Sequence, residues 1–197
     1  MVRLAIGVVF AATASISANV HMTSTLRAAP SVADSLTRFP AVSGDNLNGK
    51  RFDLPRDFEG ALNLVVVAFQ RQQQHDVDGW MPFLKTLAKD RNGVRIYELP
   101  TLGRRYRLMR SFIDGGMRGG IPDTAVRAAT ITLYIDKTPF RRALGLGEEN
   151  RIYILAVDRE GRVHARAAGL FTPESGAAFQ LAVFPVATRD TPSPGLK

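Results

Sequence analysis

The strongest constraint on the fold is a continuous apolar run, rich in β-branched residues, at positions 62–69 (LNLVVVAF). A run of this kind is typical of a central strand buried on both faces, because a strand with one solvated face alternates apolar and polar residues. The chain therefore needs protein layers on both sides of at least one strand. This requirement favours an α/β fold.

Helix and strand patterns alternate after this run. Apolar residues at helical spacing predict helices, β-branched runs predict strands, and Asp158-Arg159-Glu160-Gly161 is typical of a hairpin turn. In chain order we predict a helix at 77–89, a strand at 94–99, a helix at 102–113, a strand at 130–135, a short helix at 140–144, hairpin strands at 151–157 and 162–167, and a helix at 173–183. This order predicts an α/β fold with a mixed central sheet flanked by helices on both faces.

Composition limits the chemistry more than it limits the fold. The 197 residues include no cysteine, so disulfides, thiolate nucleophiles, zinc–thiolate sites and iron–sulfur ligation are all excluded. The formal net charge of +8 favours contact with anionic partners such as membranes, nucleic acid or acidic proteins. No serine lies in a nucleophile elbow, so nothing supports a hydrolase.

The two ends of the chain differ in character from the middle. A basic start, an apolar run over residues 4–14 and small residues up to position 18 predict a signal peptide at 1–18, followed by a linker at 19–37. We expect the folded domain at 38–186 and a flexible tail at 187–197. Export to the periplasm or the outside of the cell is therefore expected. A mitochondrial transit peptide, or a cytoplasmic protein that starts at Met22, are the alternatives.

Three segments resemble thioredoxin-like proteins of the peroxiredoxin and cytochrome-maturation type. The first is Leu47-Asn48-Gly49-Lys50, similar to the opening hairpin of that family. The second is Phe69 with Met81-Pro82-Phe83-Leu84, which matches the end of the central strand and the Met-Pro-x-Leu of the kinked helix without a gap. The third is YILAVDREGR at 153–162, similar to the late hairpin. The resemblance implies a thioredoxin-like fold.

The same resemblance locates the redox positions of the family. Counted from Phe69, the two catalytic cysteines would lie at Gln74 and Val77, with His75 and Asp76 between them. Counted back from Asp158, the cis-proline that faces the cysteines would lie at Ile152. Both parts of the redox apparatus are replaced, so the resemblance implies neither a thiol–disulfide oxidoreductase nor a peroxidase.

A further resemblance involves a cysteine-free group with this fold. The Phe39-Pro40 start, the strand end Tyr97-Glu98-Leu99-Pro100 and the late hairpin are similar to the mitochondrial ATP synthase assembly-factor family. This similarity implies a role in assembling a membrane complex and transfers no catalytic residue.

His75, Asp76 and Asp78 are the candidates for chemistry at the position of the redox motif. They could ligate a metal or act as acid and base, whereas the simpler interpretation is the solvated N-terminus of a helix that favours negative charge. A metal site needs three or four convergent ligands, and the other histidines, His21 and His164, lie far away in the sequence. We therefore expect no metal and no cofactor.

The densest basic cluster lies between positions 104 and 118. It could contact phosphates, anionic lipid or an acidic partner, or it could be only a solvated face. Its members are Arg104, Arg105, Arg107, Arg110 and Arg118. The cluster lacks the aromatic platforms of single-strand binders, so nucleic acid is not the favoured partner.

A glycine-rich stretch at 115–120 follows the helix predicted at 102–113. Gly115-Gly116 and Gly119-Gly120 bracket Met117-Arg118, but no Gly-Lys-Ser/Thr ending and no preceding strand make it a phosphate-binding loop. We predict a flexible connection here.

The function that the sequence favours is a redox-inactive, thioredoxin-like protein-binding domain that assists assembly of a membrane or envelope complex. Two alternatives stay open. One is a metal- or small-ligand-binding enzyme or sensor that uses the His75/Asp76 loop. The other is polyanion binding through the 104–118 arginines. The oligomeric state is left undetermined.

Overall fold

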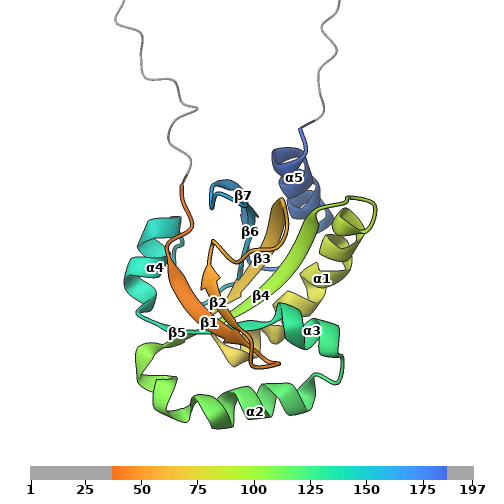
Figure 1. The fold of residues 1–197 in the computed structure, drawn as a ribbon. Helices are drawn as coiled ribbons and strands as arrows, with labels where there is room; N and C mark the ends of the chain where they lie inside the picture. The colour runs from red at the N-terminus through yellow and green to blue at the C-terminus, as the bar shows by residue number, and fades with distance from the viewer. Residues whose placement is uncertain (1–36, 186–197) are drawn as a thin grey trace, which may run out of the picture. The chain divides into compact units, whose positions relative to one another are not determined.

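A mixed sheet of seven strands organises residues 37–185, the part of the chain that the computed structural model describes (Figure 1). The strand order is β2-β1-β5-β4-β3-β6-β7. The strands are β1 (Val42–Asn46), β2 (Arg51–Leu54), β3 (Leu62–Ala68), β4 (Val94–Gly103), β5 (Ile131–Ile135), β6 (Tyr153–Asp158) and β7 (Val163–Ala168). β3, β4 and β5 are parallel neighbours, whereas β1, β2, β6 and β7 add antiparallel pairs at the two sides. The predicted α/β class and mixed sheet are confirmed.

Helices connect and cover these strands. They are the 3-10 helices η2 (Arg71–Gln73) and η3 (Arg104–Met109), and the α-helices α1 (Gln74–Lys89), α2 (Arg110–Gly120), α3 (Thr124–Ala129), α4 (Lys137–Leu144) and α5 (Pro173–Val183). Local chemistry sets several ends. The Asp123 and Asp136 carboxylates accept backbone N–H groups at the starts of α3 and α4, and Thr172 with Pro173 starts α5.

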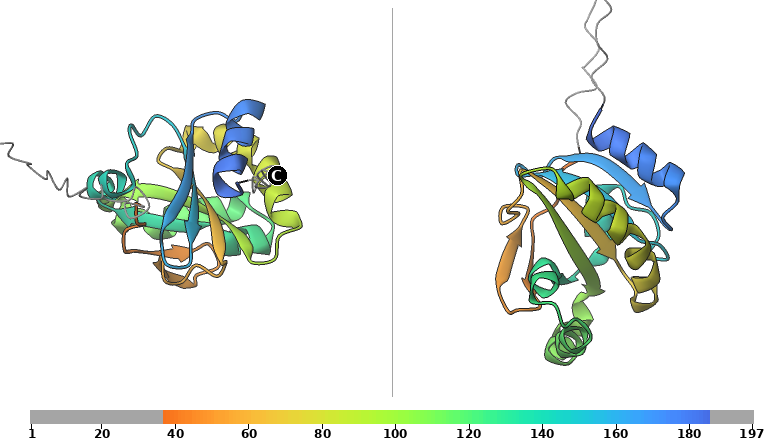
Figure 2. Two further views of the ribbon diagram at one scale, coloured as in Figure 1. Left: turned by 90° about the horizontal axis from the view of Figure 1, so that it is seen from above. Right: turned by 90° about the vertical axis from the view of Figure 1, so that its right-hand side faces the viewer.

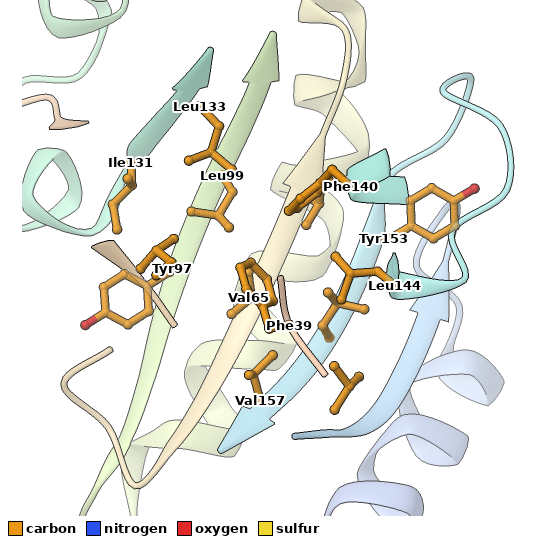
Figure 3. Packing of buried hydrophobic residues seen from close by; sticks show 14 of the residues in the cluster. Phe39, Val65, Tyr97, Leu99, Ile131, Leu133, Phe140, Leu144, Tyr153 and Val157 are labelled. Carbon is orange, nitrogen blue, oxygen red and sulfur yellow. The ribbon is translucent and has the colours of Figure 1, made fainter. Parts of the chain in front are cut away.

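One face of the sheet packs against α4 and the chain before β1. The β3 residues Val65 and Val67 contribute to this cluster, as do Phe140 and Leu144 of α4. Figure 3 shows these α4 side chains together with Leu99 and Leu133 of the parallel strands, from which the cluster continues to Phe39. This side of the strand is fully dry, because Val65 and Val67 have no exposed surface.

The other face packs against α1 and α5 (Figure 2). The alternate β3 residues Leu64 and Val66 join Trp80 of α1 and Phe179 of α5 in a second cluster. Trp80 is fully buried, and its indole Nε1 donates a 2.9 Å hydrogen bond to the backbone oxygen of Gly169. Both faces of β3 are therefore buried, as the apolar run predicts.

The glycine-rich stretch and the basic cluster differ from our predictions. Residues 115–120 are not a flexible connection, because they form the second half of α2. The residues at 104–109 are not α-helical but form the 3-10 helix η3, which leads into α2. A contact with a residue distant in sequence holds the stretch in place, because Arg118 Nε donates a 2.8 Å hydrogen bond to the Leu47 backbone oxygen.

Other elements are longer than predicted or were not predicted. β4 continues to Gly103, and α3 has no counterpart among the predicted segments. The β1–β2 hairpin implied by the resemblance is present. Within residues 37–185, no helix is both long enough and apolar enough to cross a membrane. The predicted signal peptide at 1–18 and the tail at 187–197 lie outside the described residues, as does nearly all of the 19–37 linker.

Candidate functional site

The segment after β3, residues 70–77, takes its shape from one buried side chain. The Gln73 amide oxygen accepts backbone N–H groups from Phe69 (2.8 Å) and Gln70 (3.1 Å). Its amide nitrogen donates to the Glu149 backbone oxygen at 2.7 Å. Gln73 is only 3% exposed, so these bonds form away from water and fix the chain between β3 and α1.

The side chains at the redox positions separate into exposed and buried ones. Gln74 is exposed in the first turn of α1, where its amide donates a 3.0 Å hydrogen bond to Asp78 Oδ1. Val77 and Ile152 are both buried and belong to the same cluster as Trp80. The structure thus places Val77 and Ile152 in the core and leaves Gln74 on the surface.

The candidate metal ligands do not converge. His75 and Asp78 are exposed on α1 and Asp76 is half-buried in its first turn. No group of three potential His, Asp or Glu ligands comes together anywhere between residues 37 and 185. His164 lies at β7, where its Nε2 is 2.8 Å from Asp158 Oδ2. Neither histidine therefore adds a ligand to the Asp76 and Asp78 carboxylates.

Glu98, on β4, is a titratable residue that the sequence analysis did not single out. It lies opposite Val66 in the sheet register, on a largely covered part of β4. No hydrogen bond or ion pair to another described residue stabilises its carboxylate. Burial, together with the negative charge of Asp78, raises the pKa of Glu98 to about 7. The alternation of β4 could have indicated this, because Glu98 follows Ile96 on the face that α1 covers.

A hollow lies beside the sheet edge formed by β1, β2 and β5. It has a volume of about 380 Å³, and four arginines line it together with Asp45, Thr132 and Tyr134: Arg51, Arg104, Arg107 and Arg110. We call it the arginine cavity. Three of these arginines belong to the predicted basic cluster, whereas Arg51 comes from β2. Arg105 and Arg118 are exposed but do not line the cavity.

Ion pairs and hydrogen bonds hold α2 over this edge of the sheet. Arg110 pairs with Asp45 of β1 and lies 3.8 Å from Asp114 on its own helix. The Tyr134 hydroxyl donates a 2.8 Å hydrogen bond to Asp114 Oδ1. Burial raises the pKa of Tyr134, and the hydrogen bond to Asp114 raises it further. This network binds Arg110, and it includes neither Arg104 nor Arg107.

Solved structures of similar shape decide what kind of fold this is. The thioredoxin domain of a thiol-disulfide oxidoreductase from Bacteroides vulgatus is 18% identical, with 76% of this chain and 98% of that chain covered and a TM-score of 0.49. BsSco, a member of the Sco family of cytochrome c oxidase assembly proteins, is 12% identical, with 75% and 92% covered and a TM-score of 0.51. A proposed electron transfer protein from Aquifex aeolicus VF5 is 11% identical, with 74% and 96% covered and a TM-score of 0.50. The chain has a thioredoxin-like fold.

This thioredoxin-like chain matches no family model and no curated protein by sequence. Its similarity to solved structures is low in sequence identity and therefore concerns the fold. The similarity to ATP synthase assembly factors is not shown by any of these comparisons. Structural similarity therefore supports the thioredoxin-like fold, whereas the function of this chain depends on its own residues.

Proposed function

We propose that this chain is a redox-inactive thioredoxin-like domain that binds protein partners through residues 70–75 and assists assembly of a membrane or envelope complex. A chain without cysteine has no side chain that can form or attack a disulfide. The scaffold is nevertheless complete, with a seven-stranded sheet and two buried clusters. A retained fold without its thiols is best explained by a binding role.

The observation that carries the proposal is the contrast between Gln73 and its neighbours. Gln73 is buried and holds the segment rigid, whereas the side chains around it are exposed: Gln70, Arg71, Gln72, Gln74 and His75. Amide side chains offer both donors and acceptors, which suit hydrogen bonds to a partner's backbone. A rigid segment also binds with a smaller entropic cost than a mobile one.

One protein of similar fold supports the assembly role. BsSco belongs to a family of cytochrome c oxidase assembly proteins, so the fold can serve a membrane complex. The resemblance to ATP synthase assembly factors supports the same role. The apolar residues at positions 4–14 and the proposed export of the chain would place it beside such a complex.

Crosslinking in cells with a C-terminally tagged full-length chain tests the proposal. We expect the same membrane-complex subunits in replicate captures. Their yield should fall at least about tenfold in a Gln72→Ala/Gln74→Ala/His75→Ala variant, because the amide contacts are lost. The matched control is Lys85→Ala/Thr86→Ala/Lys89→Ala, which changes exposed residues of the same helix outside the segment. Equal captures from both variants would contradict the proposal.

A further inference from the structure

The two large apolar side chains with the highest exposed fractions among the described residues lie on one short stretch, at the junction of η3 and α2. Leu108 is 97% exposed and Phe112 is 80% exposed. They are four residues apart, and Met109 between them is also exposed, at 53%. Folding leaves this apolar group unburied, so it is available to a partner of some kind.

The charges next to this apolar group in the sequence are positive, with one exception. Arg104, Arg105 and Arg107 form no ion pair with any residue between 37 and 185. The only acid between positions 101 and 122 is Asp114, which already binds Tyr134 and lies beside Arg110. The surface is therefore complementary to a partner that is negatively charged at its surface and apolar beneath it.

The arginine cavity is lined in part by arginines that immediately precede or follow Leu108 and Met109 in the sequence, and it adds a binding place for an anion. Arg104 and Arg107 line it, and neither has a carboxylate partner among residues 37–185. Asp45, its one acidic lining residue, is already paired with Arg110. Thr132 also lines the cavity, although its hydroxyl oxygen is itself buried and has no hydrogen-bond partner within the described part of the chain. Guanidinium groups without a carboxylate partner are suitable ligands for a phosphate.

We propose that η3 and α2 dock on an anionic phospholipid surface. Leu108 and Phe112 enter the boundary between headgroups and acyl chains, and Arg104 and Arg107 contact headgroup phosphates. Short apolar-and-basic helical segments bind such interfaces by burying apolar area and by attraction to anionic lipid. α2 lies at one extremity of the domain, away from α5, so a flat surface can reach it (Figure 2).

The lipid surface is favoured over a nucleic acid or a protein groove. A nucleic acid would leave Leu108 without an apolar partner, and only two aromatic side chains, Tyr106 and Phe112, lie on the segment for bases to stack on. An acidic protein could pair with the arginines, but the nearly complete exposure of Leu108 suits a partner that surrounds the side chain on all sides, as a lipid phase does. This inference concerns a different surface from residues 70–75 and does not depend on the proposed protein binding.

Vesicle flotation with the full chain tests the inference. We expect binding to vesicles of equal parts phosphatidylcholine and phosphatidylglycerol, and little binding to phosphatidylcholine alone. Leu108→Ser/Phe112→Ser should weaken binding at least about tenfold, because the inserted apolar area is lost. Arg104→Gln/Arg107→Gln should weaken it roughly thirtyfold and reduce its salt dependence.

Matched variants control for general changes in surface character. Leu170→Ser/Leu181→Ser removes two exposed leucines elsewhere, and Arg142→Gln/Arg151→Gln removes two exposed arginines outside the cluster. Both should bind like the unmodified chain, and circular dichroism should show every variant folded. Equal binding to both vesicles, or unchanged binding by Leu108→Ser/Phe112→Ser, would overturn the inference. The inference would also be overturned if inorganic phosphate shifted the NMR signals of cavity residues while the chain did not bind anionic vesicles.

Discussion

The Tyr134 hydroxyl and Asp114 Oδ1 lie 2.8 Å apart and join α2 to β5. The bond matters because α2 has no buried residue and contains four glycines, which makes it a weak helix by itself. The position of α2, and with it of the exposed Leu108 and Phe112, therefore depends on a few polar contacts with the sheet.

Removal of this hydroxyl should loosen α2. We expect Tyr134→Phe to lower the local stability of α2 by about 1–2 kcal/mol, because a hydrogen bond to a charged group is lost. Hydrogen–deuterium exchange of α2 amides measures this directly. Tyr153→Phe, which removes a hydroxyl bonded to the Glu148 backbone oxygen, is the control and should leave α2 exchange unchanged. Equal protection of α2 in both variants would show that the bond does not anchor the helix.

Glycine-to-alanine substitutions should have opposite effects on stability in α2 and in α5. A Cβ at Gly116 would meet no atom within 4 Å, so Gly116→Ala should stabilise the protein by about 0.5–1 kcal/mol through helix propensity. A Cβ at Gly176 in α5 would lie 2.7 Å from Phe171, so Gly176→Ala should destabilise it by about 1–3 kcal/mol. Chemical denaturation gives both values. Destabilisation by Gly116→Ala would mean that residue 116 is not helical.

These glycines also show where local sequence reasoning fails. The strand at 62–69, the helix from Pro173 and the late hairpin could be predicted, because their apolar periods and turn residues agree with their packing. Gly115 and Gly116 favour a loop locally, yet long-range contacts such as that of Tyr134 with Asp114 keep them helical. The residue pattern in a short segment of sequence gives no information about such long-range contacts.

The site was predictable to a similar, partial degree. Four of the five arginines in the predicted basic cluster lie within positions 104–110, so the cluster was visible in the sequence. Arg51, in contrast, joins the cavity only through the pairing of β1 with β2. Glu98 was overlooked because its burial depends on α1, which crosses β4 only in the folded chain. Arg51 and Glu98 could not be predicted as site residues, because their positions depend on tertiary neighbours and not on residue type.

Glu98 predicts a pH-dependent stability. Its pKa is raised by folding to about 7, so the folded state binds a proton more tightly than the unfolded state. Protonated Glu98 contributes its full stabilisation below the unfolded pKa. This contribution is lost as pH rises through about 7, which lowers the free energy of unfolding by up to about 3 kcal/mol. Glu98→Gln should therefore be more stable than the unmodified chain at about pH 8 and similar at about pH 4. Denaturation at several pH values tests this, with the exposed Glu148→Gln as control. A pH profile unchanged by Glu98→Gln would contradict it.

The assignment of Gln74 and Val77 to the redox positions can be tested by restoring the thiols. Residues three apart in a helix have Cα atoms about 5 Å apart, which permits a disulfide. Gln74→Cys/Val77→Cys should form a reversible disulfide, with a thiol pKa at position 74 below that of an ordinary cysteine because it lies at the start of α1. Thr86→Cys/Lys89→Cys has the same spacing at the other end of α1 and should lack this lowered pKa. Identical alkylation profiles for the two pairs would argue against the assignment.

The central claim, that residues 70–75 contact a protein partner, is tested most directly by a photoreactive amino acid placed at Gln72 of the full-length chain in cells. Gln72 is exposed and lies beside the fixed Gln73, so a bound partner should be within reach. We expect a discrete crosslinked product that contains a subunit of a membrane complex and is absent when the probe is placed at the exposed Arg142 on α4. No product from Gln72, or the same products from both positions, would contradict it.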